Sequence, residues 1–268
     1  MKQTLKSSLI NVLGYANAFP TKMTDPCRLR SLLTSLYPLS PNKKLIRLGP
    51  KGDGGYLLPD DLEEIHACFS PGVSIISGFE MDCAERGMKV FLADKSVDGP
   101  AEEHELFHFT KTFVGAISNE EFMTLDEWVC ASVPEKDSDL LLQIDIEGHE
   151  YEVFLSTSNS LMTRFRIIVA EFHYLDLLWS DPFFNLASRA FEKILQNHSC
   201  VHIHPNNFHG TIRKAGITIP KTMEFTFLRN DRISRKSYQT IFPNPLDCDN
   251  TGNATLSLPN CWYLGAEL

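Results

Sequence analysis

Short apolar runs alternate with amphipathic segments through most of this chain. Apolar runs bounded by polar or turn-forming residues predict strands over residues 67–69, 89–93, 107–114, 140–146, 166–172, 201–204 and 224–228. Between them, helices are predicted over residues 79–87, 125–132, 150–156 and 183–197. The last helix has the clearest pattern, because its apolar residues recur with a period near 3.6. Strands that alternate with helices predict a parallel sheet covered on both faces.

The end of this pattern differs from the rest. No strong helix separates the last two predicted strands, and only the loop over residues 205–222 connects them. We therefore expect a hairpin-like excursion there and one antiparallel strand in the sheet.

The flanks of the pattern are irregular. Four prolines interrupt residues 1–44, which predicts a helical or irregular lead-in. The main domain is expected over residues 45–232, with residues 233–268 as an extension packed on it. The glycine-rich segment Gly52–Gly55 could be a lid over a site or an ordinary surface turn.

Charge and composition exclude several classes of protein. The 268 residues carry 25 Lys and Arg against 34 Asp and Glu, a net charge of −9, which argues against a general nucleic-acid binder. No stretch of about 18 apolar residues predicts a membrane span. Residues 1–18 superficially resemble a signal peptide, but Asn11 and Gly14 break the apolar patch. We therefore expect a cytoplasmic protein, with secretory entry as the alternative.

The cysteines predict neither a metal ribbon nor a disulfide framework. There are seven, an odd number, and no two are spaced as Cys-x-x-Cys. Reduced thiols in a cytosolic chain are the expectation. Cys248 and Cys261, which flank a polar loop, could pair outside the cytosol.

The first two strand ends carry residues suited to a ligand. An open α/β sheet binds its ligand outside the carboxyl ends of its strands. Gly72 would allow a close backbone approach there, and Asp94, some twenty residues later, is placed to accept ribose hydroxyls; either could also be a simple turn residue. Glu80, early in the next helix, could favour the helix dipole or meet a cationic ligand. The absent Gly-x-Gly-x-x-Gly motif counts against a nicotinamide oxidoreductase.

Later strand ends carry carboxylates and imidazoles. Because side chains alternate along a strand, each of the following pairs is expected to share one face: Asp145 with Glu147, Glu171 with His173, and His202 with His204. Two buried carboxylates without partners would cost several kcal/mol, so they should face a ligand, a metal or a cation unless they form salt bridges. Histidine is the natural base near neutral pH. The cluster could also hold a divalent cation, but the spacing selects none, so no metal site is assigned.

These residues resemble the FkbM-type S-adenosylmethionine-dependent methyltransferases. The resemblance is carried by Asp-Ile-Glu-Gly-His-Glu over residues 145–150, with Thr-Leu-Asp-Glu-Trp over 124–128 upstream. Residues 69–73, 78–80, 47–56, 201–207 and 224–229 resemble one branch of that family. The match covers roughly residues 45–230. A sequence Ser-Pro-Gly stands where most methyltransferases have a richer glycine loop.

The resemblance implies a fold, a cofactor and a reaction. The fold would be α/β, the class I (Rossmann-like) methyltransferase sheet of seven mostly parallel strands with the last antiparallel. The reaction would be methyl transfer from S-adenosylmethionine, most often to a hydroxyl oxygen of a small-molecule or sugar-like (glycan) acceptor. Cofactor contacts would come from the following residues: Ser70, Gly72, Glu80, Asp94 and Ser118, the last within the adenine-lining segment 116–118.

The resemblance also points to the catalytic groups. Asp145 would lie beside the reactive methyl group, and Asp145, His173 or His204 could accept the proton of the hydroxyl acceptor. The alternative to an enzyme is a catalytically silent methyltransferase-like module that binds a partner. The polar strand ends favour the enzyme, since a silent module need not maintain them.

Overall fold

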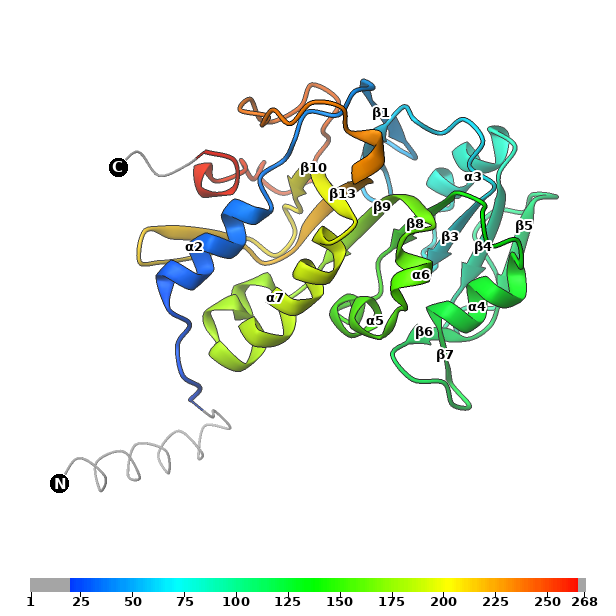
Figure 1. Cartoon of the computed structure of the whole chain (residues 1–268), viewed down its shortest axis with the longest axis horizontal. Coiled ribbons are helices and arrows are strands. Elements are labelled where there is room, and N and C mark those ends of the chain that lie inside the picture. Colours follow the sequence, from blue (N-terminus) through cyan, green and yellow to red (C-terminus); the bar gives the residue numbers. More distant parts are fainter. Residues whose placement is uncertain (1–19, 265–268) are drawn as a thin grey trace.

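The computed structural model describes residues 20–264, and a seven-stranded sheet forms its centre (Figure 1). The strands lie across the sheet in this order: β5 (Phe107–Thr110), β4 (Lys89–Ala93), β3 (Ala67–Pro71), β8 (Leu140–Ile144), β9 (Phe165–Phe172), β13 (Met223–Arg229) and β10 (His198–Pro205). All neighbours are parallel except β13, which is antiparallel to both β9 and β10. The predicted fold class, including the antiparallel last strand, is confirmed.

The helices follow the predicted pattern. They are α2 (Pro26–Ser35), α3 (Gly78–Glu85), α4 (Leu125–Ser132), α5 (Glu150–Ser156), α6 (Asn159–Met162) and α7 (Asp181–Leu195). Thr124 caps α4: its side chain accepts a hydrogen bond from the backbone N–H of Glu127, and the Glu127 side chain accepts one from the backbone N–H of Thr124. Short 3₁₀ turns complete the set: η1 (Leu175–Trp179), η2 (Asn230–Arg232) and η3 (Asn260–Trp262).

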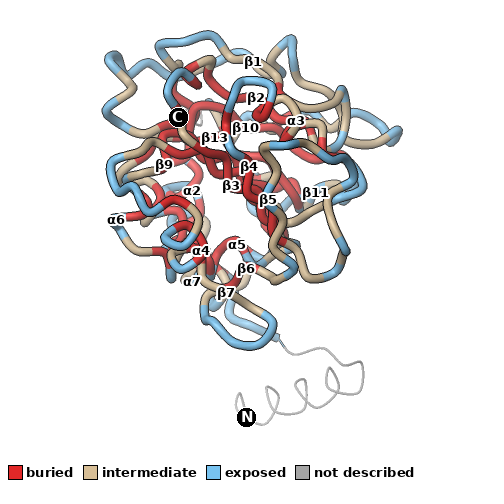
Figure 2. The backbone as a smooth tube through the Cα atoms, turned by 90° about the vertical axis from the view of Figure 1, so that its right-hand side faces the viewer, coloured by how far each residue is buried: buried red, intermediate tan, exposed pale blue. Residues whose placement is uncertain are grey.

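Each face of the sheet carries its own hydrophobic core. One core joins the sheet to α2, α4, α5 and α7 through residues such as Leu29, Val129 and Phe191. The other lies under α3 and a small antiparallel hairpin, β1 (Leu45–Leu48) and β2 (Tyr56–Pro59). Figure 2 shows the result as a band of buried strands within more exposed loops. Burial on both faces explains why these strands are nearly continuous apolar runs.

The hairpin positions the glycine-rich segment. Residues 52–55 form the turn between β1 and β2, and β2 packs over β9, β13 and β10. The Thr226 hydroxyl donates a hydrogen bond to the carbonyl of Leu57 at 2.5 Å. Asp53 and Gly54 of this turn lie beside Gly72 and Asp145, at the carboxyl ends of β3 and β8.

Two predicted elements differ from the structure. The strand expected over 107–114 is divided, because the chain turns after β5, where the N–H of Thr112 bonds to the carbonyl of Thr110 at 2.9 Å. The following residues form β6 (Phe113–Gly115), which pairs with β7 (Phe122–Thr124) in a separate sheet. The strand expected to reach residue 146 ends at Ile144. The predicted excursion at 205–222 is present as a hairpin of β11 (Thr211–Lys214) and β12 (Ile217–Pro220).

The described parts of both flanks pack on this domain. Leu29 and Leu33 of α2 join one core, and buried Trp262 donates a hydrogen bond to the carbonyl of Thr218 at 3.1 Å. Cys248 and Cys261 are free thiols. None of the helices within residues 20–264 is long and apolar enough to cross a membrane. The prediction about residues 1–18 lies outside the described range.

Candidate active site

A cavity of about 340 Å³ opens at the carboxyl ends of β3, β4 and β8. Its lining consists of Asp53, Gly54, Tyr56, Gly72, Val73, Ser74, Ile76, Glu80, Asp94, Ser96, Gln143, Asp145 and Glu147. A second cavity of about 250 Å³ shares Gly72, Asp94, Ser96, Asp145 and Glu147 with it and adds the apolar side chains of Phe113, Val114, Phe122 and Ile146. The joint site has five carboxylates, and neither a lysine nor an arginine lines it.

Gly72 brings the end of β3 against the end of β8. Its φ is +93°, and a Cβ atom at this position would lie 1.7 Å from the carbonyl oxygen of Asp145. The N–H of Gly72 also bonds to the carbonyl of Ala93 at 3.0 Å. Glycine is therefore required here by the approach of two backbones, which places Gly72 between the ends of three strands.

Asp94 fixes the loop that follows Gly72. Its Oδ2 accepts a hydrogen bond from the N–H of Val73 at 3.0 Å, and its Oδ1 accepts from the N–H of Ser96 at 2.7 Å. Asp94 also lines both cavities. It can therefore hold the loop and present a carboxylate to a ligand at the same time.

A buried polar network lies beneath the first cavity. The Ser70 hydroxyl lies 2.6 Å from Oε1 of Glu80 and 2.6 Å from Oε1 of Gln143. One hydroxyl donates only one hydrogen, so a proton on Glu80 would satisfy both contacts. Burial raises the pKa of Glu80, which favours that proton. Ser70 thus positions Glu80 and is not among the residues that line the cavity.

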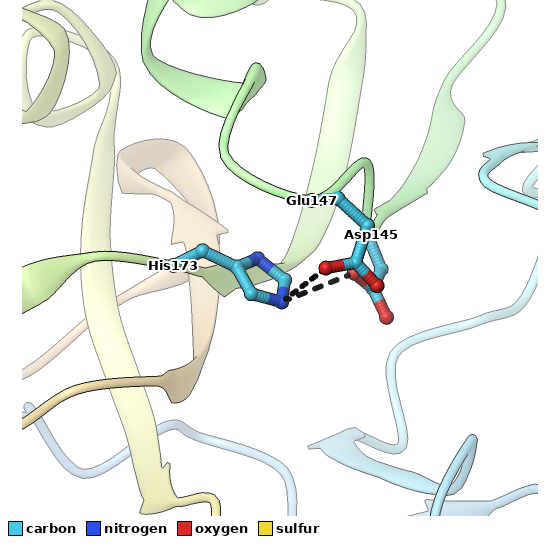
Figure 3. Close-up of side chains that lie close together, drawn as sticks. All are labelled: Asp145, Glu147 and His173. Atoms are coloured by element: carbon cyan, nitrogen blue, oxygen red, sulfur yellow. Dashed lines mark ion pairs between the residues drawn. The ribbon is translucent and has the colours of Figure 1, made fainter. Parts of the chain in front are cut away.

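Asp145, Glu147 and His173 converge at the rim of the site (Figure 3). The Nε2 atom of His173 lies 3.8 Å from Oδ1 of Asp145 and 3.6 Å from Oε2 of Glu147. Asp145 and Glu147 do not share a strand face, because β8 ends at Ile144 and Glu147 turns with a φ of +58°. They meet through this turn.

Glu150 holds the turn and the imidazole together. Its Oε1 accepts hydrogen bonds from the N–H of Ile146 at 3.0 Å and the N–H of Gly148 at 3.1 Å. The same oxygen lies 3.3 Å from Nδ1 of His173. Glu150 itself is fully buried at the first position of α5. Glu150, at the start of α5, thus ties the turn after β8 to His173 and sets the orientation of the imidazole.

Buried carboxylates continue along the sheet edge toward β10. Glu171 accepts from the Asn206 amide at 2.8 Å, and its neighbour Glu224 accepts from the Asn250 amide at 2.7 Å. Burial and nearby carboxylates raise the pKa of Glu171, and burial raises that of Glu224. Burial likewise raises the pKa of Asp145, opposed by His173. Burial alone would lower the pKa of His173, but Glu150 and its neighbours raise it.

His204 lies at another place on the same edge. Its Nδ1 is 3.7 Å from Oδ2 of Asp247, whose Oδ1 is 2.8 Å from Nε2 of His202. These histidines share a face, as predicted, but they line or border a separate cavity of about 250 Å³ that involves the C-terminal extension. In register, Glu224 of β13 stands between His204 and Glu171. The structure therefore does not bring His204 to Asp145 and His173.

Ser118 lies near the N-terminus of α4, outside both cavities. Its hydroxyl contacts the carboxylate of Glu127 and accepts from the N–H of Thr124 at 3.1 Å. Phe113 and Val114, slightly earlier in the chain, line the apolar cavity instead.

Sequence reasoning missed several residues of the site. Gln143 had a readable signal, a polar residue inside a buried strand, and so had Glu150, a carboxylate directly after a strand turn. Tyr56 and Asp53 reach the cavity through the β1–β2 hairpin, which no periodic pattern predicts. Asp247 belongs to the irregular C-terminal segment.

The structure is an α/β protein with an open, mostly parallel sheet and a cavity at the carboxyl ends of its strands. Residues 79–198 match the family model "Methyltransferase FkbM domain", so this segment, somewhat less than half of the chain, belongs to that family. The predicted resemblance is confirmed. No curated protein matches the chain significantly.

Solved structures similar to this chain share little sequence with it. A putative DNA modification methyltransferase encoded within an E. coli prophage has 8% identity and a TM-score of 0.43; the match covers 68% of this chain and 52% of that one, so this chain spans about half its length. A structure on conversion of a disulfide into a thioacetal during echinomycin biosynthesis has 12% identity and a TM-score of 0.30, covering 61% and 76%. A putative methyltransferase from an antibiotic biosynthesis pathway of Anabaena variabilis has 13% identity and a TM-score of 0.29, covering 69% and 67%.

Proposed function

We propose that this protein is an S-adenosylmethionine-dependent O-methyltransferase that acts on a hydroxyl of a small-molecule or sugar-like acceptor. The observation that carries the proposal is the acidic cavity: five Asp and Glu side chains from four segments of the chain line one space, together with an apolar extension. The family match over residues 79–198 supports methyl transfer as the reaction class.

The charge of the cavity fits this cofactor. S-adenosylmethionine carries a sulfonium and an ammonium group against one carboxylate, so a lining of carboxylates attracts it. A dinucleotide cofactor carries an anionic pyrophosphate, which the same lining would repel. The acidic cavity therefore favours the methyl donor over a nicotinamide cofactor.

Each of the two cavities would hold a chemically different part of the cofactor. Phe113, Val114 and Phe122 offer an apolar surface for the adenine ring, and Asp94, which lines both spaces, would accept the ribose hydroxyls. Glu80 and Gln143 would meet the methionine portion. When bound, the cofactor supplies an activated methyl group on a sulfonium.

The residues near the acceptor would then assist transfer of the methyl group. The acceptor oxygen forms a bond to the methyl carbon, the methyl–sulfur bond breaks with its electron pair going to sulfur, and the hydroxyl proton is released. Asp145 and His173 would orient that hydroxyl and favour loss of its proton. Because His204 lies in another cavity, we assign the two groups at the rim, and not His204, to this role.

Calorimetry with S-adenosylhomocysteine tests the cofactor assignment. We expect binding in the micromolar range, which corresponds to about 8 kcal/mol. Asp94→Ala should weaken it by roughly tenfold or more, because hydrogen bonds to a charged group are worth about 1.5–3 kcal/mol. Asp98→Ala, an exposed carboxylate on the same loop, is the matched control and should bind normally. No binding by the wild-type protein would refute the proposed function, and equal binding by Asp94→Ala would refute the ribose assignment.

A further inference from the structure

The rim cluster of Asp145, Glu147 and His173 has the spacing of a metal site. One ligand atom from each residue lies within 4.8 Å of the other two. A divalent ion bonded at about 2.1 Å to each ligand would separate its ligand atoms by roughly 3–4.2 Å, and Nε2 of His173 lies 3.8 and 3.6 Å from the two carboxylates. Figure 3 shows the imidazole edge directed at both carboxylates. The three side chains therefore already surround a space of the right size.

The buried imidazole gives an independent sign of a ligand. The His173 side chain is only 8% exposed, and its Nδ1 faces a Glu150 oxygen that already accepts two backbone N–H groups. Nδ1 must therefore be the donor, which leaves the lone pair of neutral imidazole on Nε2. Nε2 makes no hydrogen bond within residues 20–264, and it points at two carboxylates. A carboxylate that orients a histidine in this way is the usual support of a metal ligand.

A proton alone would not satisfy this arrangement. The separations from Nε2 to Asp145 and Glu147, 3.8 and 3.6 Å, exceed the 2.7–3.2 Å range of N–H···O hydrogen bonds. The Asp145 Oδ1 atom is buried and has no hydrogen-bond partner in the described chain. A cation between the three groups would contact all of them, whereas a proton on Nε2 would bond to neither carboxylate.

We propose that Asp145, Glu147 and His173 bind one divalent cation, with Glu150 as the residue that orients His173. One imidazole with two carboxylates is a mixed donor set, suited to Mn²⁺ or Zn²⁺ better than to Mg²⁺ or Ca²⁺. Three protein ligands leave further positions for oxygen atoms of a second molecule. Glu147 is 84% exposed, so the site is accessible from solvent.

The position of the ion deepens the proposed function, on which its role in the reaction depends. Asp145 and Glu147 also line the acidic cavity, so the ion would lie at its rim, where the acceptor hydroxyl must meet the methyl group. A bound cation lowers the pKa of a coordinated hydroxyl. An acceptor with two neighbouring oxygen atoms, a vicinal diol, could occupy two open positions at once. His173 would then act as a metal ligand and not as the base, and the proton of the coordinated hydroxyl would pass to solvent, which reaches the site beside exposed Glu147.

Binding of Mn²⁺ tests the site without reference to activity. The full chain is treated with chelator, dialysed and titrated with Mn²⁺, and free Mn²⁺ is followed by its electron paramagnetic resonance signal. We expect one saturable site per chain, with binding at least tenfold weaker in Glu147→Gln. Glu152→Gln is the matched control. It changes an exposed carboxylate in the first turn of α5, and this variant should bind Mn²⁺ as the wild type does. Zn²⁺ should compete for the site.

Three outcomes separate the two proposals. Absence of saturable Mn²⁺ or Zn²⁺ binding, or equal binding by Glu147→Gln and wild type, overturns the metal site while leaving cofactor binding intact. Mn²⁺ binding without S-adenosylhomocysteine binding refutes the proposed function and keeps the metal site. If the chelated enzyme transfers methyl groups at the full rate, the ion has no role in the reaction.

Discussion

Carboxylates at the two ends of the central sheet have different partners. At the amino ends of the strands, Asp139 pairs with Arg166 at 2.6 Å and with Arg229, and Arg232 pairs with Asp61 at 2.7 Å. At the carboxyl ends, Glu80, Asp94, Asp145, Glu147, Glu171 and Glu224 lie near one another, and none of them forms a salt bridge with a lysine or arginine of residues 20–264.

This difference separates structural charges from charges that face a ligand. The chain can supply guanidinium partners to carboxylates at a sheet end, since it does so at the amino end. Buried carboxylates without such partners cost free energy of folding. Their concentration at one edge therefore identifies the part of the molecule where stability is reduced to keep a site acidic.

Replacing an aspartate by asparagine should change stability most at the amino end of the sheet. Asp139→Asn removes the charge that faces Arg166, which is almost fully buried, and Arg229. We expect a loss of about 3 kcal/mol in the free energy of unfolding, because breaking a buried pair leaves an uncompensated charge. Urea denaturation at pH 7 measures this. Asp98→Asn, which changes an exposed carboxylate, is the control and should unfold at the same urea concentration as the wild type. A loss in Asp139→Asn no larger than in this control would remove the contrast between the two ends.

Two histidines of β10 extend the comparison. At the amino end, burial lowers the pKa of His198 to about 4, and its Nε2 bonds to the carbonyl of Phe165 at 2.7 Å, with Arg229 and Asp231 nearby. At the carboxyl end, burial would lower the pKa of His204, but Asp247 and Glu224 raise it. One strand thus keeps one imidazole neutral and favours charge on the other.

Acid should destabilise the protein through His198. The unfolded state binds a proton below pH 6.5 and the folded state only below about pH 4, so stability is lost as pH falls through this window. The difference corresponds to about 3 kcal/mol. Denaturation of wild type and His198→Gln at pH 7 and pH 4 should show that the variant loses about 3 kcal/mol less. His209→Gln, at an exposed position, should behave as the wild type. Equal acid losses in all three proteins would contradict the assignment.

The smallest effect is expected at the acidic edge. Asp145→Asn removes a carboxylate that faces Glu147 and Glu150 without a hydrogen bond to its Oδ1. With chelator present, we expect a gain of about 1 kcal/mol in stability, opposite in sign to Asp139→Asn. The same denaturation experiment decides the sign. A loss of 2 kcal/mol or more would mean that Asp145 is a structural charge like Asp139.

The sequence predicts the sheet well because burial has a direct signature. Strands covered on both faces, such as β8 and β9, are continuous apolar runs, and Thr124 marks the start of α4 chemically. The division of residues 107–114 was missed, because both parts are rich in aromatic residues and a two-residue turn leaves the pattern almost unbroken.

The site was predicted in part, because sequence does not show the order of strands. Gly72, Glu80, Asp94 and Asp145 follow strands that are neighbours in space, and they line one cavity. His173 follows β9 and His204 lies within β10, the next strand of the central sheet along the chain, but β13 lies between these strands and separates the two histidines. Asp247, the partner of His204, comes from a segment without periodicity.

The placement of β13 also determines when the central sheet can form during synthesis. Until residues 223–229 leave the ribosome, β9 keeps one unpaired edge and β10 has no partner strand in the sheet. Glu224, which closes the row of carboxylates, arrives with the same strand. A nascent chain therefore has to wait for residues 223–229 before β10 can join the sheet, and a product that ends before them would leave an open edge on β9 and no sheet partner for β10.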